Sequence, residues 1–189
     1  YLFFTDVYPN IGQSLRYSSF QVATIITTTG FATANYDVWP TFCAMVIFIL
    51  FFIGGCSSST SGGLKVIRVS VLGKMLKRTL EQQLHPRAVL DIKDNNKIIP
   101  SDTVQNIFSF ALLYWAMVAI IGLIVSLDGF DVITNFSAAA SCLGNIGPGF
   151  HEVGPTVNYS IFSYPVKLVL SLAMIAGRLE LYTLFIVVT

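Results

Sequence analysis

Two short segments combine a glycine with backbone groups that could bind a cation. Each glycine follows a run of small or apolar residues, and the two segments, 18–36 and 135–153, align without a gap at an offset of 117 residues. This register places like residues opposite one another: Gly30 with Gly147, Ala23 with Ala140, and Thr24 with Ser141. Such a repeat indicates that both segments have the same structural task.

Backbone carbonyl oxygens bind a cation when they replace its water shell, and glycine lets such carbonyls turn in the required direction. A half-helix that ends just before the glycine points its partly negative end toward the cation. The alternative is that each glycine only terminates a helix, but two aligned segments favour the ion site. The candidate ion-binding walls are Thr28, Thr29, Gly30 and Phe31 in one segment, and Asn145, Ile146, Gly147 and Pro148 in the other.

Composition places these segments in a lipid bilayer. The chain is 54% hydrophobic and only 11% charged, whereas a soluble domain carries about a quarter charged residues. The formal net charge is +1, which implies no nucleic-acid partner. Three apolar stretches are expected to span the bilayer: 41–53, 103–127, and 159–189, the last of them tilted or broken near Gly177.

The distribution of charge predicts the orientation. Eight of the eleven lysines and arginines lie between residues 65 and 97, so this segment is expected on the cytoplasmic side. Stretches 1–40 and 128–160 then face outward and are acidic, which would concentrate cations. The runs before the two glycines, about ten residues each, are too short to cross and suit re-entrant half-helices that line a protein cavity. Two spans separate them, so they form a parallel repeat about an axis along the membrane normal.

Two further features lie where a pore could be closed. Residues 54–63, GGCSSSTSGG, should unwind the first span inside the bilayer, because glycine and serine weaken a helix. Such a break is tolerated beside a water-filled cavity; the alternative is an ordinary linker. Arg178 lies midway along the last stretch, where we expect an electrostatic barrier beneath the ion site, or else a local pair with Glu180 or a structural bond to a pore-helix end.

Residues that could support other chemistry are few. Cys43, Cys56 and Cys142 form neither a disulfide framework nor a metal-ligand spacing. His85 and His151 are expected on opposite sides of the membrane, so a hydrolase that uses the serine run lacks a base. We therefore predict no enzymatic activity and no covalent cofactor.

Four motifs in order resemble the TrkH/KtrB potassium transporters, most closely the bacterial TrkH branch. They are TTTGFAT, IGGCSSSTSGGLKVIR, NIGPGF and AGRLELYTL. The resemblance implies an all-α membrane fold of repeated helix–pore-loop–helix units. In this chain it implies a partial third repeat over 1–73, a cytoplasmic amphipathic linker over 74–102, and the fourth repeat over 103–189. It also implies that the tract is an intramembrane gate, with the gating residues Gly54, Gly55, Ser57, Ser58, Ser59, Thr60, Gly62, Gly63 and Arg178.

The same resemblance implies K⁺ uptake across a bacterial inner membrane, by a homodimer that binds a cytoplasmic nucleotide-binding regulatory subunit of the TrkA type. The alternatives are a less selective sodium/potassium permease and a regulatory membrane subunit that transports nothing. A neutral-solute pore of the aquaporin kind would need re-entrant loops that enter from opposite sides. One glycine per loop leads us to expect weaker selection of K⁺ over Na⁺ than in a dedicated channel.

Overall fold

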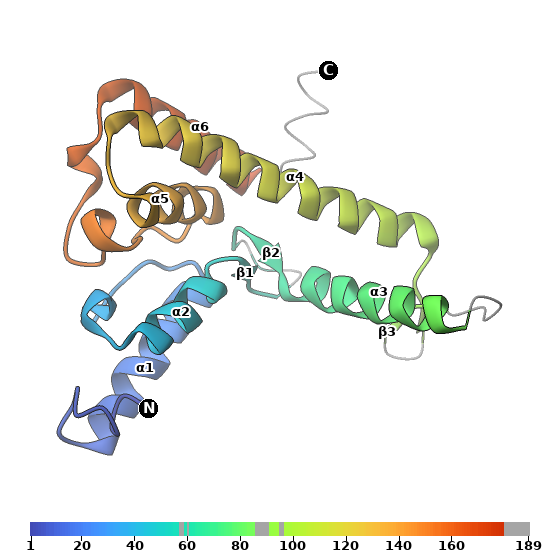
Figure 1. Cartoon of the computed structure of the whole chain (residues 1–189), viewed down its shortest axis with the longest axis horizontal. Helices are drawn as coiled ribbons and strands as arrows, with labels where there is room; N and C mark the ends of the chain where they lie inside the picture. The colour runs from blue at the N-terminus through green and yellow to red at the C-terminus, as the bar shows by residue number, and fades with distance from the viewer. Residues whose placement is uncertain (57–58, 60, 86–90, 95–96, 180–189) are drawn as a thin grey trace.

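The computed structural model describes residues 1–56, 59, 61–85, 91–94 and 97–179, and these are predominantly helical (Figure 1). The all-α fold class is confirmed. The α-helices are α1 (Ile11–Ile26), α2 (Thr41–Leu50), α3 (Val66–Leu84), α4 (Ser101–Val125), α5 (Val132–Gly144) and α6 (Tyr164–Arg178). Short 3-10 turns are η1 (Tyr36–Val38), η2 (Ser126–Asp128), η3 (His151–Val153) and η4 (Tyr159–Ile161). Strands β1 (Ile53–Gly54) and β2 (Leu64–Lys65) pair in parallel, and β3 (Lys93–Asp94) pairs antiparallel with β4 (Lys97–Ile98).

Helix lengths decide which predicted spans can cross a membrane unaided. Among the described residues, one helix is long and apolar enough, Ser101–Asp128, which joins α4 to η2. Helix α2 has only 10 residues, about 15 Å of rise against a hydrocarbon core of about 30 Å. The first predicted span is therefore a short helix followed by non-helical chain. Helix α6 reaches Arg178, and residues 180–189 of the third predicted span lie outside the described residues.

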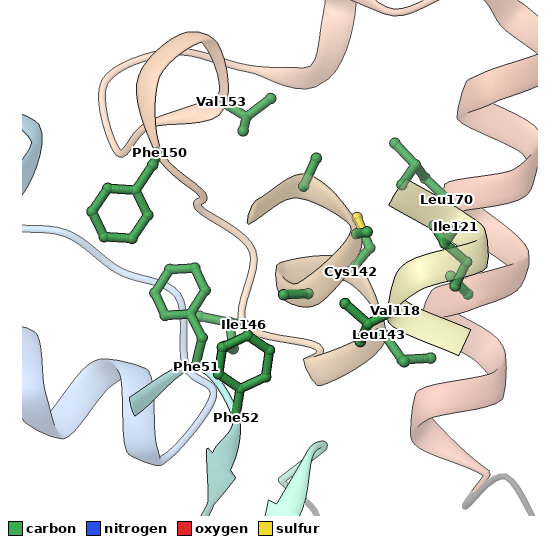
Figure 2. Close-up of a cluster of buried hydrophobic side chains, with 14 of the residues drawn as sticks. Phe51, Phe52, Val118, Ile121, Cys142, Leu143, Ile146, Phe150, Val153 and Leu170 are labelled. Carbon is green, nitrogen blue, oxygen red and sulfur yellow. The ribbon is translucent and has the colours of Figure 1, made fainter. Parts of the chain in front are cut away.

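Helix α5 packs against both α4 and α6 (Figure 1). Its Ala138, Ala139 and Ala140 are fully buried, and their small side chains let the neighbouring helices approach closely. Figure 2 shows Leu143 and Cys142 of α5 beside side chains of α4 and α6. Gly177 of α6 permits the closest approach, because a β-carbon there would lie 1.9 Å from the Leu143 carbonyl oxygen.

A cluster of phenylalanines joins the two halves of the chain. Phe51, which follows α2, lies 5.4 Å from Phe150, which follows α5, measured between ring centroids. Phe48 contacts both Phe136 at 6.1 Å and Phe150 at 5.9 Å. The labelled rings of Phe51, Phe52 and Phe150 lie together near Ile146 in Figure 2. Because these contacts are apolar and buried, they hold the loop after α5 against the chain that follows α2.

Helix α3 and the β3–β4 hairpin form the polar part of the chain. A small cluster of Val71, Ile92 and Val104 anchors α3 to the start of α4. The first part of the predicted amphipathic linker, residues 74–84, is thus the second half of a longer helix that begins at Val66, and residues 86–90 lie outside the described residues. Its outer face exposes Leu76, Leu80 and Leu84.

Candidate functional site

Helices α1 and α5 end in the same hydrogen-bonded turn. In the first, Thr29 N–H donates to the Thr24 carbonyl at 2.9 Å and Thr28 N–H to Ile25 at 3.1 Å. In the second, Ile146 N–H donates to Ser141 at 2.9 Å and Asn145 N–H to Cys142 at 3.1 Å. These pairs lie at equivalent positions of the 117-residue repeat, and both form the Schellman pattern of helix ends.

The backbone angles repeat in the same way. Thr28 and Asn145 have φ of 51° and 54°, the left-handed region that residues other than glycine rarely occupy. Two residues later, Gly30 and Gly147 have φ of 81° and 109°. Each helix therefore stops, reverses hand and continues through a glycine, as the half-helix-then-glycine interpretation predicts. Both helices are longer than the expected ten residues, at 16 and 13.

The two loops meet at their glycines. A β-carbon on Gly30 would lie 2.3 Å from the Ile146 carbonyl oxygen, and the nearest atom to one on Gly147 is the Gly30 Cα at 3.8 Å. The structure thus brings together the two predicted walls at Gly30, Ile146 and Gly147. The Phe31 side chain, by contrast, is 71% exposed.

Side-chain hydroxyls bond the loop that follows α5. Tyr159 Oη donates to the Gly147 carbonyl at 2.8 Å, and Tyr36 Oη donates to the Gly149 carbonyl at 2.8 Å. Ser141 Oγ accepts from Gly147 N–H at 3.1 Å and donates to the Pro148 carbonyl at 2.9 Å. Sequence reasoning missed Tyr36 and Tyr159. The repeat alignment had marked only the Ser141 position, because nothing in the local sequence ties a tyrosine to a distant carbonyl.

The loop that follows α1 is bonded differently. Thr24 occupies the position of Ser141, yet its Oγ1 is buried and has no hydrogen-bond partner within the part of the chain that the structure describes. Thr27 and Thr29 instead bond to each other through their hydroxyls at 2.8 Å. Gln21 Nε2 donates to the Ala34 carbonyl at 2.9 Å and closes the loop on its own helix.

Two acidic residues, Asp37 and Asp131, contact His151. Asp37 Oδ1 accepts from His151 N–H at 3.2 Å, and partial burial raises the Asp37 pKa although that bond and the His151 charge lower it. Asp131 caps α5 and lies 3.2 Å from His151 Nδ1. Burial raises the pKa of Asp131, but hydrogen bonds from Thr134 and the nearby histidine outweigh it, so the net shift is downward.

The described residues of the glycine- and serine-rich tract are not helical, as predicted, and its two ends are joined. Its ends pair through β1 and β2, and Val66 N–H donates to the Gly55 carbonyl at 3.2 Å. Ser61 Oγ accepts from Gly55 N–H at 2.8 Å, and Lys65 Nζ donates to the Ser59 carbonyl. The predicted gating residues Ser57, Ser58 and Thr60 lie outside the described residues.

This loop lies against both helix ends that carry the predicted walls. A β-carbon on Gly55 would lie 3.5 Å from the Ile26 carbonyl oxygen at the end of α1. One on Gly62 would lie 2.3 Å from the Gly144 carbonyl oxygen at the end of α5. Gly54 is as confined, since its β-carbon would meet the Gly62 carbonyl oxygen at 2.2 Å, and Gly63 has φ of 72°.

Arg178 shares a small cavity with the loop. The cavity has a volume of about 130 Å³, and Ser59, Ser61, Gly62, Gly63 and Lys65 line it from the loop side. Arg68, Tyr114, Leu143, Gly177 and Arg178 are among the residues that complete it. The arginine predicted as a barrier and the tract predicted as a gate, apart in sequence, are therefore neighbours.

The described residues hold no group of three or more histidine, cysteine or acidic side chains that could bind a metal ion. The cysteines Cys43, Cys56 and Cys142 are free thiols.

Comparison with known proteins identifies the family. The TrkH family, described as a cation transport protein, matches residues 7–189. The potassium uptake protein TrkH of Vibrio parahaemolyticus is 38% identical over 188 residues, covering 98% of this chain and 37% of that protein. TrkI of Halomonas elongata is 35% identical, covering 93% of this chain and 36% of its own length. Their names describe potassium transporters and not enzymes.

The crystal structure of the Vibrio parahaemolyticus potassium transporter TrkH superimposes with a TM-score of 0.90 at 35% identity, covering 100% of this chain and 40% of the transporter chain. The chain therefore spans about two fifths of the proteins that it matches. It belongs to the TrkH family of cation transport proteins, which are membrane proteins.

Proposed function

We propose that the protein containing this chain takes up K⁺ across a bacterial inner membrane through a pore lined by backbone carbonyls. Thr28, Thr29, Gly30 and Phe31 would form one wall of the filter, and Asn145, Ile146, Gly147 and Pro148 another. The observation that carries the proposal is the matched pair of loops, which have the same Schellman turn, the same sign of φ and a direct contact at their glycines. Its support from relatives is that their names describe potassium uptake.

In this proposal the chain contributes two of the repeats of a longer transporter. Residues 1–73 would be part of one pore repeat, 74–102 a cytoplasmic linker, and 103–189 the next repeat. The 117-residue register between equivalent backbone conformations supports this division. Because the chain spans about two fifths of its relatives, the remaining walls of the pore would come from other parts of the protein.

The tract 54–63 would be the gate, together with Arg178. Its place supports this role: the loop contacts the carbonyl ends of both α1 and α5, where a cation leaving the filter would pass. An arginine in the same cavity would lower cation occupancy there by charge repulsion. Arg178→Ala should therefore raise cation flux, whereas Arg16→Ala, an exposed arginine on α1, should not; an unchanged flux for Arg178→Ala would exclude the barrier.

The proposed assembly is a homodimer that binds a nucleotide-binding regulatory subunit of the TrkA type at its cytoplasmic face. The support on this chain is the basic helix α3, which exposes Leu76, Leu80 and Leu84 beside lysines and an arginine. A less selective sodium/potassium permease is the second candidate, because each loop offers a single glycine.

The test is rubidium uptake by the intact parent protein in bacteria that lack their own potassium importers. Gly147→Ser should abolish uptake or make it sensitive to Na⁺, because a side chain at φ of 109° forces the loop to rearrange. Wild-type uptake that the substitution leaves unchanged, in protein shown to reach the membrane, would leave Gly147 as a helix terminator. No uptake by the wild type would refute the transport proposal itself.

A further inference from the structure

Three successive carbonyl groups of the loop after α5 accept hydrogen bonds from side-chain hydroxyls. Tyr159 Oη holds the Gly147 carbonyl at 2.8 Å, Ser141 Oγ holds that of Pro148 at 2.9 Å, and Tyr36 Oη holds that of Gly149 at 2.8 Å. Each of these three oxygens is therefore held by a hydroxyl group of the protein. In the described part of the chain, the carbonyls of Asn145 and Ile146 accept no hydrogen bond, and the Ile146 oxygen lies against Gly30 of the other loop.

We infer that Tyr159 is a positioning residue that decides which oxygens of this wall face the cation. Its hydroxyl turns the Gly147 carbonyl away, so that Asn145 and Ile146 provide the ion-facing oxygens and Gly147 provides the change of direction. This inference rests on the proposed pore, and it assigns to Tyr159 a part in ion selection.

The structure around Tyr159 suits a fixed donor. The side chain is partly buried, and its ring lies 5.9 Å from that of Phe162. It approaches Gly147 from η4, and its hydroxyl also neighbours Ser141 and Cys142 of α5. A donor held by packing on one side and by the helix on the other fixes the carbonyl that it binds.

Among the described residues, the carbonyls of the other wall are held differently. The 117-residue register ends before the next helices, α2 and α6, and the residue in the place of Tyr159 is Tyr36, which also follows an asparagine cap but donates to the Gly149 carbonyl and not to that of Gly30. Thr24, opposite Ser141, leaves its hydroxyl without a partner among the described residues. No hydrogen bond to the Gly30 carbonyl is seen there either. The two walls therefore share a backbone path but differ in how their carbonyls are held, and within the described residues the hydroxyl donors to successive carbonyls lie on the wall after α5.

The consequence concerns discrimination between ions. A filter distinguishes K⁺ from Na⁺ by the number and freedom of the oxygens that surround the ion. Removing the Tyr159 hydroxyl would free the Gly147 carbonyl to turn toward the pore and let the wall adapt to the smaller ion. We expect discrimination to fall by about threefold to tenfold, the factor that corresponds to one ordinary hydrogen bond.

The experiment compares inhibition of rubidium uptake by Na⁺ for the intact parent protein and its Tyr159→Phe variant. Phenylalanine keeps the ring and removes only the donor. The matched control is Tyr164→Phe, which removes a hydroxyl from an 88% exposed side chain nearby. The expected result is stronger Na⁺ inhibition for Tyr159→Phe alone, with an unchanged melting temperature of the purified protein. Equal Na⁺ inhibition in all three proteins would overturn the inference while leaving the proposed transport intact.

A second variant covers the case in which Tyr159→Phe does not fold. Incorporation of 3-fluorotyrosine at position 159 keeps the side chain and makes the hydroxyl a stronger donor. Discrimination against Na⁺ should then increase, and an unchanged ratio would equally overturn the inference. A wild-type protein that takes up no rubidium would instead refute the proposed function, so the two failures are distinguishable.

Discussion

Gly30 and Gly147 lie 117 residues apart in the chain yet touch: the Gly30 Cα is 3.8 Å from the position that a β-carbon on Gly147 would take. The contact is not symmetric. A β-carbon on Gly30 would overlap the Ile146 carbonyl oxygen at 2.3 Å, whereas one on Gly147 would meet no atom closer than the Gly30 Cα. These two glycines occupy equivalent positions of the repeat but are constrained differently. Gly30 is constrained both by the neighbouring carbonyl and by its backbone angles, whereas Gly147 is constrained by its backbone angles alone.

This asymmetry predicts unequal effects of alanine. Gly147→Ala should cost about 1–3 kcal/mol of backbone strain and reduce rubidium uptake. Gly30→Ala carries similar strain at φ of 81° and must also displace the Ile146 carbonyl, so it should cause the larger loss. The measurement is uptake normalised to protein in the membrane. Equal losses would show that the contact between the loops contributes nothing.

Gly62 provides a test of the proposed gate. Alanine there would overlap the Gly144 carbonyl oxygen and push the loop away from the end of α5. We expect Gly62→Ala to raise basal cation flux. The control is Gly73→Ala in the middle of α3, where a β-carbon meets nothing within 4 Å. That change should leave flux unaltered and stabilise the helix by about 1 kcal/mol. If Gly73→Ala raised the flux as well, the increase in Gly62→Ala could not be assigned to displacement of the 54–63 loop.

Lys65 ties the same loop to its base. Its side chain is buried, at 7% exposure, and donates to the Ser59 carbonyl. Lys65→Met keeps the length of the side chain and removes the donor, so the loop should loosen and become more accessible to a cysteine reagent at Cys56, an exposed thiol. Lys77→Met, at a site with 78% side-chain exposure, is the control. If Cys56 were labelled at the same rate in all three proteins, the Lys65–Ser59 hydrogen bond would not be what holds the loop closed.

The Asp131 cap of α5 should contribute to the stability of the folded protein in a pH-dependent way. It accepts from Ile133 N–H and Thr134 N–H, each at 3.2 Å, and Asp131→Ala should destabilise the parent protein by about 1 kcal/mol at pH 7. Because its pKa is lowered in the folded state, the charged form stabilises the fold. That contribution is complete above the ordinary aspartate pKa of about 4 and is lost as the pH falls below it.

Thermal unfolding of Asp131→Ala and wild type at several pH values measures this effect. The difference in melting temperature should stay constant down to about pH 4 and narrow as the pH is lowered further. Glu152→Ala, on the exposed η3 turn of the same outer surface, should show no comparable difference. A gap between Asp131→Ala and wild type that is independent of pH would mean that packing, and not the charged cap, is responsible.

The sequence by itself determined the features that depend on local composition. Small residues before Gly30 and Gly147 specify two helices that stop short of crossing a bilayer, and the glycine- and serine-rich tract specifies the break after α2. These outcomes follow from propensities within about ten residues, so a pattern read along the chain was sufficient. The 117-residue register also holds in the structure, where Thr28 and Asn145 both adopt left-handed backbone angles that the sequence pattern did not predict.

Only the tertiary structure decided what bonds the loops. The hydroxyls of Tyr36 and Tyr159 reach carbonyls 113 and 12 residues away, and neither partner has a sequence signal, because any backbone carbonyl accepts equally well. The tertiary fold also showed that Gly177 serves a close helix contact and that Arg178 shares a cavity with the glycine- and serine-rich loop. Local propensity sets where each helix ends, whereas the packing of distant segments sets which groups meet there.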